Sequence, residues 1–335
     1  MNTAKRFVPP GPLGFGGAPL GNMFAAVDEH AAEATLVTAW GNGIRYFDTA
    51  PFYGSGLSEH RFGQVLRRYD RDMFVLSTKV GRLLVPDPGA KDNPPFVDSL
   101  SFRPVFDYSA DGARRSIEDS LQRLGLARID IAYIHDIAED MHGSEWERLF
   151  GEAMQGAAKA LTEMREQGTI RAWGLGVNRT EACLRALEQS DPDVFLLAGR
   201  YSLLDTAALD TLFPACAERG VSVVIGGPYN SGLLAGGAHF EYAAAPPEMI
   251  KKRDRIAHVC KDYDVDIRAA ALQFCAAHPV VASVIPGSKN AGKVRVNADL
   301  IRRPIPDAFW EDLKEEGLLP RSAPVPSRET QIATA

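Results

Sequence analysis

Four side chains of complementary chemistry end or follow successive apolar segments of the chain: Asp48, Tyr53, Lys79 and His135. A phenol titrates near about pH 10, and an adjacent ammonium stabilises the phenolate and lowers the pKa of the phenol. A carboxylate that pairs with the ammonium fixes its position, while an imidazole can orient and polarise a substrate oxygen. The set therefore predicts acid–base chemistry at an alcohol or carbonyl oxygen, with Tyr53 exchanging the proton near neutral pH.

Each of these residues has an ordinary structural explanation when it is considered alone. A lone Asp often caps an element, a lone Lys is usually solvated, and a lone His is more often structural than catalytic. Lys79 and His135, however, each end a β-rich segment, where a polar side chain is costly unless it faces an open rim. None of the four accepts a hydride, so redox chemistry here requires a cofactor.

The elements that must position these residues follow from the hydrophobic pattern. Eight strand-like segments are Leu13–Gly17, Ile44–Asp48, Phe74–Lys79, Ile129–His135, Ala172–Val177, Val194–Leu197, Val221–Ile225 and Val281–Pro286. Amphipathic segments between them are Glu29–Trp40, Ser58–Arg68, Ala110–Leu124, Ala153–Gln167, Thr180–Gln189, Thr206–Arg219 and Ala291–Arg302. Ser58 and Thr180 occupy expected N-cap positions. The alternation predicts an α/β fold, a single (β/α)8 TIM barrel over residues 1–335, rather than a doubly wound sheet with a second domain.

Three long segments each follow the carboxyl end of a predicted strand: Gly81–Tyr108, Asp136–Gly151 and Gly226–Pro247. Long irregular loops at this end of a barrel usually form the wall of the active site. Phe52 and Trp146 are candidates for the substrate pocket, with simple packing as the alternative. The tail from about Arg303 is expected to be partly irregular.

Composition excludes several functional classes. The 335 residues are 45% hydrophobic, and 37 Lys and Arg against 43 Asp and Glu give a net charge of −6. Nucleic acid or an anionic membrane surface would require a basic field, so neither is an expected partner. Four widely separated cysteines indicate reduced thiols, and the chain has neither a signal-like start nor a membrane-length apolar run, which predicts a cytoplasmic protein. Nothing in the sequence specifies an oligomeric state.

The sequence resembles the aldo-keto reductase family from about Leu13 to Leu300. The matching motifs are IRYFDTAPFYGSGLSE (Ile44–Glu59), VLSTKVG (Val75–Gly81), SLQRLGLARIDIAYIHD (Ser120–Asp136), GTIRAWGLGVN (Gly168–Asn178) and VIPGSKN (Val284–Asn290). The resemblance implies that Asp48, Tyr53, Lys79 and His135 form a catalytic tetrad. In it Tyr53 is the proton donor or acceptor, Lys79 modifies its pKa, Asp48 holds Lys79, and His135 orients the substrate.

The same resemblance implies an NAD(P)(H) cofactor bound without a Rossmann unit, and the chain has no G-x-G-x-x-G motif between a strand and a helix. Asn178 matches the position that holds the nicotinamide carboxamide. The adenosine half and its phosphate would be held by residues that surround the start of the last barrel helix, namely Gly287, Ser288, Lys289, Lys293 and Asn297.

Some positions depart from the family pattern. Gly226 replaces a tyrosine that stacks on nicotinamide in many relatives, Ala198 replaces a glutamine, and the usual N-terminal hairpin is shortened, so the barrel floor must be closed differently. Gly287 and Lys293 stand where relatives that require NADP(H) often have Lys and Arg. Arginine can bind a phosphate with two parallel hydrogen bonds, so the absence of this arginine predicts that NAD is the preferred cofactor, with NADP as the alternative.

The variants FGGAPLGN, DTAPFYG and LLAGRYSLLD resemble the subgroup that includes D-threo-aldose (L-fucose) 1-dehydrogenase and pyridoxal 4-dehydrogenase. This implies an NAD(P)-dependent dehydrogenase that oxidises an aldose hemiacetal or a pyridoxal-type alcohol as its small-molecule substrate. Two alternatives stay open. One is a general aldehyde or ketone reductase, and the other is an auxiliary subunit that binds the cofactor with little turnover.

Two rival motifs are weaker. GSKNAGK (Gly287–Lys293) fits the core of a phosphate-binding P-loop, but Val294 follows it, so the hydroxyl that binds Mg²⁺ is missing. The residues His258, Cys260, Cys275 and His278 include possible zinc ligands, but they lack the short paired spacings of structural zinc sites. No metal is therefore expected.

Overall fold

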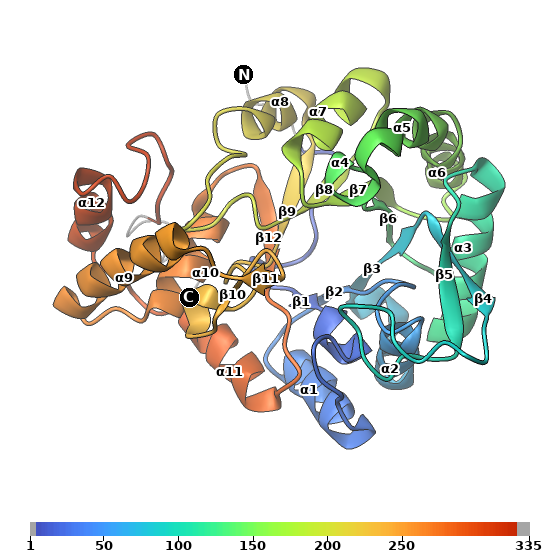
Figure 1. Cartoon of the computed structure of the whole chain (residues 1–335), viewed down its shortest axis with the longest axis horizontal. Helices are drawn as coiled ribbons and strands as arrows, with labels where there is room; N and C mark the ends of the chain where they lie inside the picture. Colours follow the sequence, from blue (N-terminus) through green and yellow to red (C-terminus); the bar gives the residue numbers. More distant parts are fainter. Residues whose placement is uncertain (1–4, 327–335) are drawn as a thin grey trace.

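The computed structural model describes residues 5–326 and contains a parallel eight-stranded barrel surrounded by helices (Figure 1). The strands, in spatial order, are β1 (Phe15–Gly16), β2 (Tyr46–Asp48), β3 (Val75–Val80), β6 (Ile131–His135), β7 (Ala172–Val177), β8 (Val194–Ala198), β9 (Ser222–Gly226) and β12 (Val281–Ile285). The helices that alternate with them are α1 (Glu29–Gly41), α2 (Leu57–Leu66), α3 (Ala110–Leu124), α6 (Ala157–Glu166), α7 (Thr180–Gln189), α8 (Leu212–Arg219), α10 (Ile267–Ala277) and α11 (Ala291–Leu300). The predicted (β/α)8 barrel is confirmed.

Closure of the barrel depends on close backbone contact between β1 and β12. Parallel bridges join Leu13 to Val284 and Gly16 to Gly287. A Cβ atom on Gly287 would lie 2.8 Å from the ring of Pro19, so this junction has no room for a side chain. The glycine is therefore explained by the closure of the barrel itself.

Helix boundaries differ from the expectations at several places. Ser58 lies inside α2, whose N-cap is Gly56, and Thr180 is the first residue of α7, whose N-cap is Arg179, so both predicted caps are wrong. The helix expected over 206–219 begins only at Leu212. The single helix expected over 153–167 is instead α6 preceded by a separate helix, α5 (Trp146–Gln155), and Gly156 lies between them. A Cβ atom on Gly156 would lie 2.7 Å from the carbonyl oxygen of Tyr108, so the chain turns where only glycine can approach that backbone.

The three long segments after β3, β6 and β9 contain regular structure rather than irregular loops. The first forms an antiparallel hairpin of β4 (Arg82–Pro86) and β5 (Phe102–Phe106). The second contains α4 (Glu139–His142) and α5, and the third contains the hairpin of β10 (His239–Phe240) and β11 (Ala243–Ala244). Helix α9 (Pro247–Asp262) follows, and α12 (Asp307–Glu315) lies in the tail that was expected to be partly irregular, of which residues 327–335 fall outside the described part.

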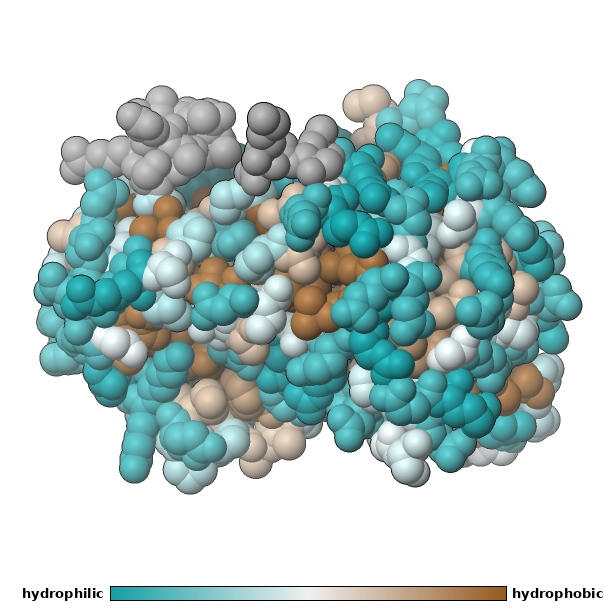
Figure 2. All heavy atoms as spheres, turned by 90° about the horizontal axis from the view of Figure 1, so that it is seen from above, coloured by the Kyte–Doolittle hydropathy of each residue, from teal (hydrophilic) through white to brown (hydrophobic). Residues whose placement is uncertain are grey.

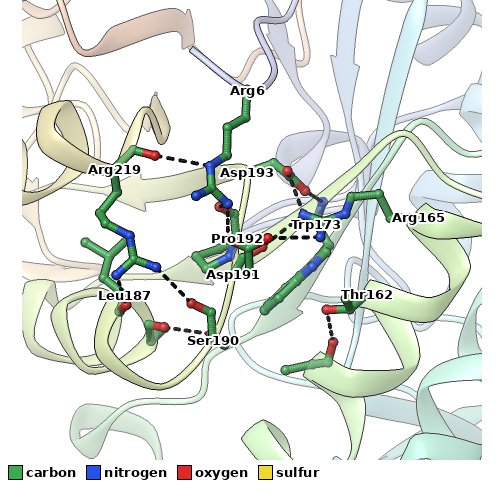
Figure 3. A network of polar contacts seen from close by, with 12 residues as sticks. Arg6, Thr162, Arg165, Trp173, Leu187, Ser190, Asp191, Pro192, Asp193 and Arg219 are labelled. Carbon is green, nitrogen blue, oxygen red and sulfur yellow. Dashed lines mark hydrogen bonds and ion pairs between the residues drawn. The ribbon is translucent and has the colours of Figure 1, made fainter. Parts of the chain in front are cut away.

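The opposite end of the barrel is closed by the N-terminal segment. The Phe7 ring packs against the side chains that fill the barrel interior, and Ser222 Oγ donates a hydrogen bond to the Phe7 carbonyl. The Arg6 guanidinium pairs with Asp191 and donates to the carbonyl of Arg219 (Figure 3). This short segment takes the place of the hairpin that was expected to be shortened.

A layer of ion pairs continues outward from this floor. Figure 3 shows Arg165 beside Asp191 and Asp193, and the Arg165–Asp193 contact is 2.7 Å. The second oxygen of Asp193 accepts the backbone N–H of Trp173 at the start of the β7 ladder. Charge therefore fixes the N-terminal ends of the strands, where side chains contribute to stability rather than to catalysis.

Hydrophilic residues cover most of the face shown in Figure 2. Four of the large hydrophobic residues that are exposed, Phe24, Phe106, Met141 and Tyr242, belong to segments that follow carboxyl ends of barrel strands. No helix among residues 5–326 is long and apolar enough to cross a membrane. The four cysteines are free and buried, and burial raises the pKa of the Cys183 thiol.

Candidate active site

The predicted tetrad lies at the carboxyl ends of three adjacent strands. Asp48 ends β2, His135 ends β6, and Lys79 lies in β3, which pairs with both. Tyr53 follows in the loop that leads to α2. Parallel pairing aligns strand ends at one rim, so residues far apart in the sequence converge there.

Asp48 and Lys79 form a buried ion pair. Lys79 Nζ lies 2.8 Å from Asp48 Oδ2 and donates a second bond, also 2.8 Å, to the Thr49 carbonyl. The other carboxylate oxygen accepts a 2.7 Å hydrogen bond from Ser77 Oγ. Burial raises the pKa of Asp48, while Lys79 and these hydrogen bonds oppose that effect. The ammonium is thus fixed from two sides.

Tyr53 lies over this ion pair and beside His135. Lys79 Nζ is 4.6 Å from the centroid of the Tyr53 ring, and the Tyr53 and His135 rings are perpendicular with centroids 5.9 Å apart. The structure therefore brings the four predicted residues together in one cluster.

The expected lowering of the Tyr53 pKa is wrong for this state of the protein. Burial raises the pKa of Tyr53 well above its usual value, and the negative charges of Asp48 and Asp136 add to the effect. Arg82 opposes it, but the charge of Lys79 is largely neutralised by Asp48 at 2.8 Å. Tyr53 therefore carries its proton at neutral pH.

Sequence reasoning missed two charged residues that contact His135. Arg82 Nη1 lies 3.0 Å from His135 Nδ1 and 2.7 Å from Asp136 Oδ2. The guanidinium is held between the rings of Phe52 and Phe106, at 4.3 and 4.7 Å from their centroids. Arg82 directly follows the VLSTKVG motif and Asp136 directly follows His135, so adjacency to the tetrad motifs was the available signal.

Gly81 makes this arrangement possible. It has a φ of +100°, and a Cβ atom there would lie 2.4 Å from the ring of Tyr108. Glycine alone tolerates both the backbone conformation and the close approach. The chain therefore turns sharply after β3, and Lys79 and Arg82 both reach the same site.

The two predicted pocket residues lie in different places. Phe52 is at the tetrad, with its ring 6.3 Å from that of His135. Trp146 donates a hydrogen bond from Nε1 to the Ile137 carbonyl and lines a cavity of about 340 Å³. The other residues that line this cavity are Glu139, Asp140, Arg179 and Glu181, and none of the tetrad is among them.

The predicted adenosine-binding residues gather around the N-terminus of α11. Asn290 caps this helix by accepting the backbone N–H of Lys293, and Ser288 Oγ accepts the N–H of Asn290. Lys289 and Lys293 are exposed, and in the described part of the chain neither amine pairs with a carboxylate. Asn297 accepts a 2.8 Å hydrogen bond from the Tyr229 hydroxyl.

The residues predicted to surround the nicotinamide lie at the carboxyl ends of β7, β8 and β9. Asn178 follows β7, and its carbonyl oxygen accepts a 2.8 Å hydrogen bond from Arg200. Ala198 and Gly226 face each other across the ends of β8 and β9, and a Cβ atom on Gly226 would lie 3.3 Å from that of Ala198. That spacing is tight, so glycine at position 226 avoids crowding against Ala198. The exposed Lys289 and Lys293 beside the N-terminus of α11 suit a phosphate, so this end of the site fits the phosphate of a nicotinamide dinucleotide.

The β10–β11 hairpin follows β9 and contacts two other parts of the rim. Glu241 pairs with Arg200, and the His239 ring stacks on Phe24 at 5.7 Å. Tyr242 is half exposed, and the surrounding protein together with Tyr53 and Asp136 raises the pKa of its phenol. The hairpin is thus anchored at two parts of the rim, and its turn carries Tyr242.

The rival motifs find little structural support. The P-loop-like segment lies between β12 and α11, where the following residue, Val294, is buried and offers no hydroxyl. Within residues 5–326, no group of three or more His, Cys, Asp or Glu side chains is arranged to hold a metal ion.

The fold is a parallel eight-stranded barrel with Asp48, Tyr53, Lys79 and His135 clustered at its carboxyl rim, the end at which barrel enzymes place their active sites. A model of the aldo/keto reductase family matches residues 12–316. The chain therefore belongs to the aldo/keto reductase family and is an NAD(P)-dependent oxidoreductase.

Similar proteins agree with this assignment. The chain is 42% identical to pyridoxal 4-dehydrogenase of Microbacterium luteolum and 39% identical to D-threo-aldose 1-dehydrogenase of a Pseudomonas species. Each comparison covers 92% of this chain and 94% of the relative. A solved aldo-keto reductase of Bacillus halodurans in its holo form superimposes with a TM-score of 0.72 at 25% identity, over 98% of this chain and 99% of that one.

Proposed function

We propose that the protein oxidises the hemiacetal carbon of an aldose or of pyridoxal, with Tyr53 exchanging the proton. The observation that carries this proposal is the buried Asp48–Lys79 pair beneath the Tyr53 ring, beside His135. Asp48 holds Lys79, Lys79 favours the phenolate, and His135 orients the substrate oxygen.

The two substrate classes share one chemistry. Aldoses and pyridoxal both form cyclic hemiacetals, in which one carbon bears a hydrogen, a hydroxyl group and a ring oxygen. An oxidised nicotinamide supplies the hydride acceptor and a positive charge. The substrate carbon loses its hydrogen with two electrons, the hydroxyl proton passes to the Tyr53 phenolate, and a lactone carbonyl results.

The names of the two dehydrogenases described above support this substrate class, because one acts on pyridoxal and the other on D-threo-aldoses. Aromatic and aliphatic residues at the rim, Phe52, Phe106, Met141 and Tyr242, suit the face of a sugar or pyridine ring. The preferred cofactor in this proposal is NAD, with NADP as the weaker one.

A substrate screen tests the proposal directly. Purified protein is incubated with NAD⁺ or NADP⁺ and aldoses, pyridoxal or simple alcohols, and absorbance of the reduced cofactor is followed. Turnover confined to hemiacetals is expected. In a parallel assay with NADH or NADPH, reduction of unrelated aldehydes faster than the oxidation of hemiacetals would favour a general reductase. Cofactor binding without any turnover would favour an auxiliary subunit.

Tyr53→Phe tests the proton carrier, because it keeps the ring and removes the ionisable hydroxyl. Turnover should fall by roughly 10²- to 10⁴-fold, while cofactor affinity measured by fluorescence titration changes little. Tyr69→Phe is the matched control, since Tyr69 stacks on Trp40 away from the tetrad. Near wild-type turnover in Tyr53→Phe would show that Tyr53 is not the proton carrier.

A further inference from the structure

Arg82 is a buried cation that directly contacts a tetrad residue but has no assigned role. Only 4% of its surface is exposed. Its Nη1 atom contacts His135 Nδ1 at 3.0 Å and Asp136 Oδ2 at 2.7 Å, and its Nη2 atom lies 3.6 Å from the sulfur of Met141. Two aromatic rings hold the guanidinium plane, so its position is defined by packing as well as by charge.

We propose that Arg82 is a positioning residue that keeps His135 neutral, with its single proton on Nε2. This inference rests on the proposed function, in which His135 orients the oxygen that exchanges a proton with Tyr53.

The tautomer follows from the chemistry of the two groups. A guanidinium has five N–H donors, no acceptor, and a pKa too high for it to lose a proton. A 3.0 Å contact with Nδ1 is therefore a hydrogen bond in which Nδ1 accepts. The Nη1 nitrogen has two hydrogens and can donate one to Nδ1 and the other to Asp136. Neutral His135 then carries its proton on Nε2.

Asp136 carries the negative charge near His135 that Arg82 offsets. Its carboxylate lies 3.6 Å from His135 Nε2, close enough to favour the imidazolium and to attract the Nε2 proton. The 2.7 Å ion pair with Arg82 engages the same oxygen. Asp136 has a φ of +51°, a left-handed conformation that aspartate tolerates. With this carboxylate occupied, the Nε2–H group remains free to donate to a substrate oxygen.

The charges around His135 set the expected pH behaviour. Burial lowers the pKa of His135 well below its usual value, Asp136 opposes this, and Arg82 and Lys79 add to it. The titratable groups that face or adjoin His135 are Arg82, Lys79, Asp136 and Tyr53, together with Tyr108, whose hydroxyl donates to the His135 carbonyl and contacts His142. Removing Arg82 alone leaves Asp136 unopposed at short range, so the pKa of His135 should rise.

Nitrogen-15 NMR of the histidine rings reads the tautomer without substrate or turnover. The His135 signal is assigned by its absence in His135→Asn. Wild-type protein should show a protonated Nε2 and an unprotonated Nδ1 across neutral pH. In Arg82→Met the ring should become protonated at a higher pH than in wild type. A wild-type proton on Nδ1, or an unchanged titration in Arg82→Met, would overturn the inference.

Kinetics provide the second measurement. In Arg82→Met, kcat should fall about 10- to 100-fold. The acid limb of kcat/KM should move to higher pH, because His135 becomes imidazolium at a higher pH and the neutral ring with its proton on Nε2 is lost there. Arg82→Lys restores a positive charge and should recover part of the shift. Arg103→Met is the matched control, since Arg103 lies on β5 of the same hairpin and is exposed. An acid limb that stays in place in Arg82→Met would count against the inference.

The double variant Arg82→Met, Asp136→Asn separates charge from packing. It removes the cation and its counter-charge together, so the acid limb should return toward wild type even though the packing change remains. A limb that stays shifted would mean that Arg82 acts only through packing, which would overturn the inference. Failure of the proposed function would appear differently, as loss of the Tyr53 requirement with the His135 tautomer unchanged.

Discussion

At the scale of single residues, the Asp48–Lys79 pair leaves Tyr53 protonated until a further positive charge arrives. Oxidation needs the phenolate, and burial raises the pKa of Tyr53. Because deprotonation increases with pH, kcat/KM for oxidation should rise from about pH 7 to about pH 10. Reduction needs the protonated phenol, which persists over this range because the pKa of Tyr53 is raised well above its usual value, so kcat/KM for reduction should stay flat. A flat oxidation profile over this range would contradict the assignment.

Lys79→Met should move the alkaline limb of the pH profile for oxidation to higher pH. The substitution removes the positive charge 4.6 Å from the Tyr53 ring and leaves Asp48 as an unpaired buried anion. Both changes disfavour the phenolate. The limb is measured as kcat/KM with substrate varied, and Lys159→Met, on the exposed surface of α6, serves as the control. An unchanged limb would mean that Lys79 does not tune Tyr53.

The choice of cofactor is also a single-residue property. Lys293 is exposed at the start of α11. A lysine there acts as a point charge and cannot form the two parallel hydrogen bonds that an arginine forms with a phosphate. Wild-type protein should prefer NAD by about tenfold in kcat/KM, equivalent to roughly 1.4 kcal/mol. Lys293→Arg should shift the preference toward NADP. Gly287→Lys is a poor partner for this change, because a Cβ atom there meets Pro19 at 2.8 Å.

The tetrad could be predicted from the sequence because its strand-borne members are polar side chains at the ends of apolar segments. Arg82 and Asp136 were missed for a physical reason. Nothing in a linear sequence shows that Phe52 and Phe106, far apart along the chain, enclose one guanidinium. The lowered Tyr53 pKa was wrong because it counted the charge of Lys79 without the burial and the Asp48 charge that oppose it.

At the scale of elements, the turn of the β10–β11 hairpin carries Tyr242, whose phenol interacts electrostatically with Tyr53 and Asp136. Tyr242→Ala should raise KM for the substrate about tenfold with a smaller effect on kcat, because a wall of the pocket is lost while the proton carrier remains. Tyr242→Phe keeps the ring and should stay near wild type. Steady-state kinetics at saturating cofactor decide the matter, and an unaltered KM in Tyr242→Ala would exclude the ring from the substrate pocket.

Barrel strands and most surrounding helices follow from periodicity, and Ala172–Val177, Ala110–Leu124 and Thr180–Gln189 have the predicted bounds. The structure of the insertions at the carboxyl rim could not be predicted from periodicity. The β4–β5 and β10–β11 hairpins have mixed polarity, so neither hairpin shows a repeating hydrophobic pattern. In addition, β10 and β11 contain only two residues each, which is too short for any periodicity. Their structure depends on tertiary contacts such as Arg200–Glu241.

At the scale of the whole molecule, the predicted tetrad and the N-terminal segment that closes the barrel lie at opposite ends of the barrel. Phe7→Ala should lower the free energy of unfolding by about 2 kcal/mol, since the half-buried ring leaves a gap in the barrel floor. Turnover of the remaining folded protein should stay unchanged, because the tetrad lies at the far rim. Urea unfolding and kcat are measured side by side, with exposed Val8→Ala as the control. A parallel loss of kcat would show that the two ends are coupled.

The floor also has a consequence for the order in which the protein can assemble during synthesis. Phe7 and its partner Ser222 are separated by 215 residues, and Arg6 and Arg219 by 213. The N-terminal residues are translated early, but they cannot pack into the barrel floor until β9 has been translated. The segment around β1 can complete its pairing only later, when Val284 of β12 has also been made. A nascent chain interrupted before that point exposes the interior of an open sheet, and such long-range contacts form slowly. Newly made protein should therefore gain resistance to proteolysis late and at both ends of the barrel within a short interval, rather than strand by strand from its N-terminus.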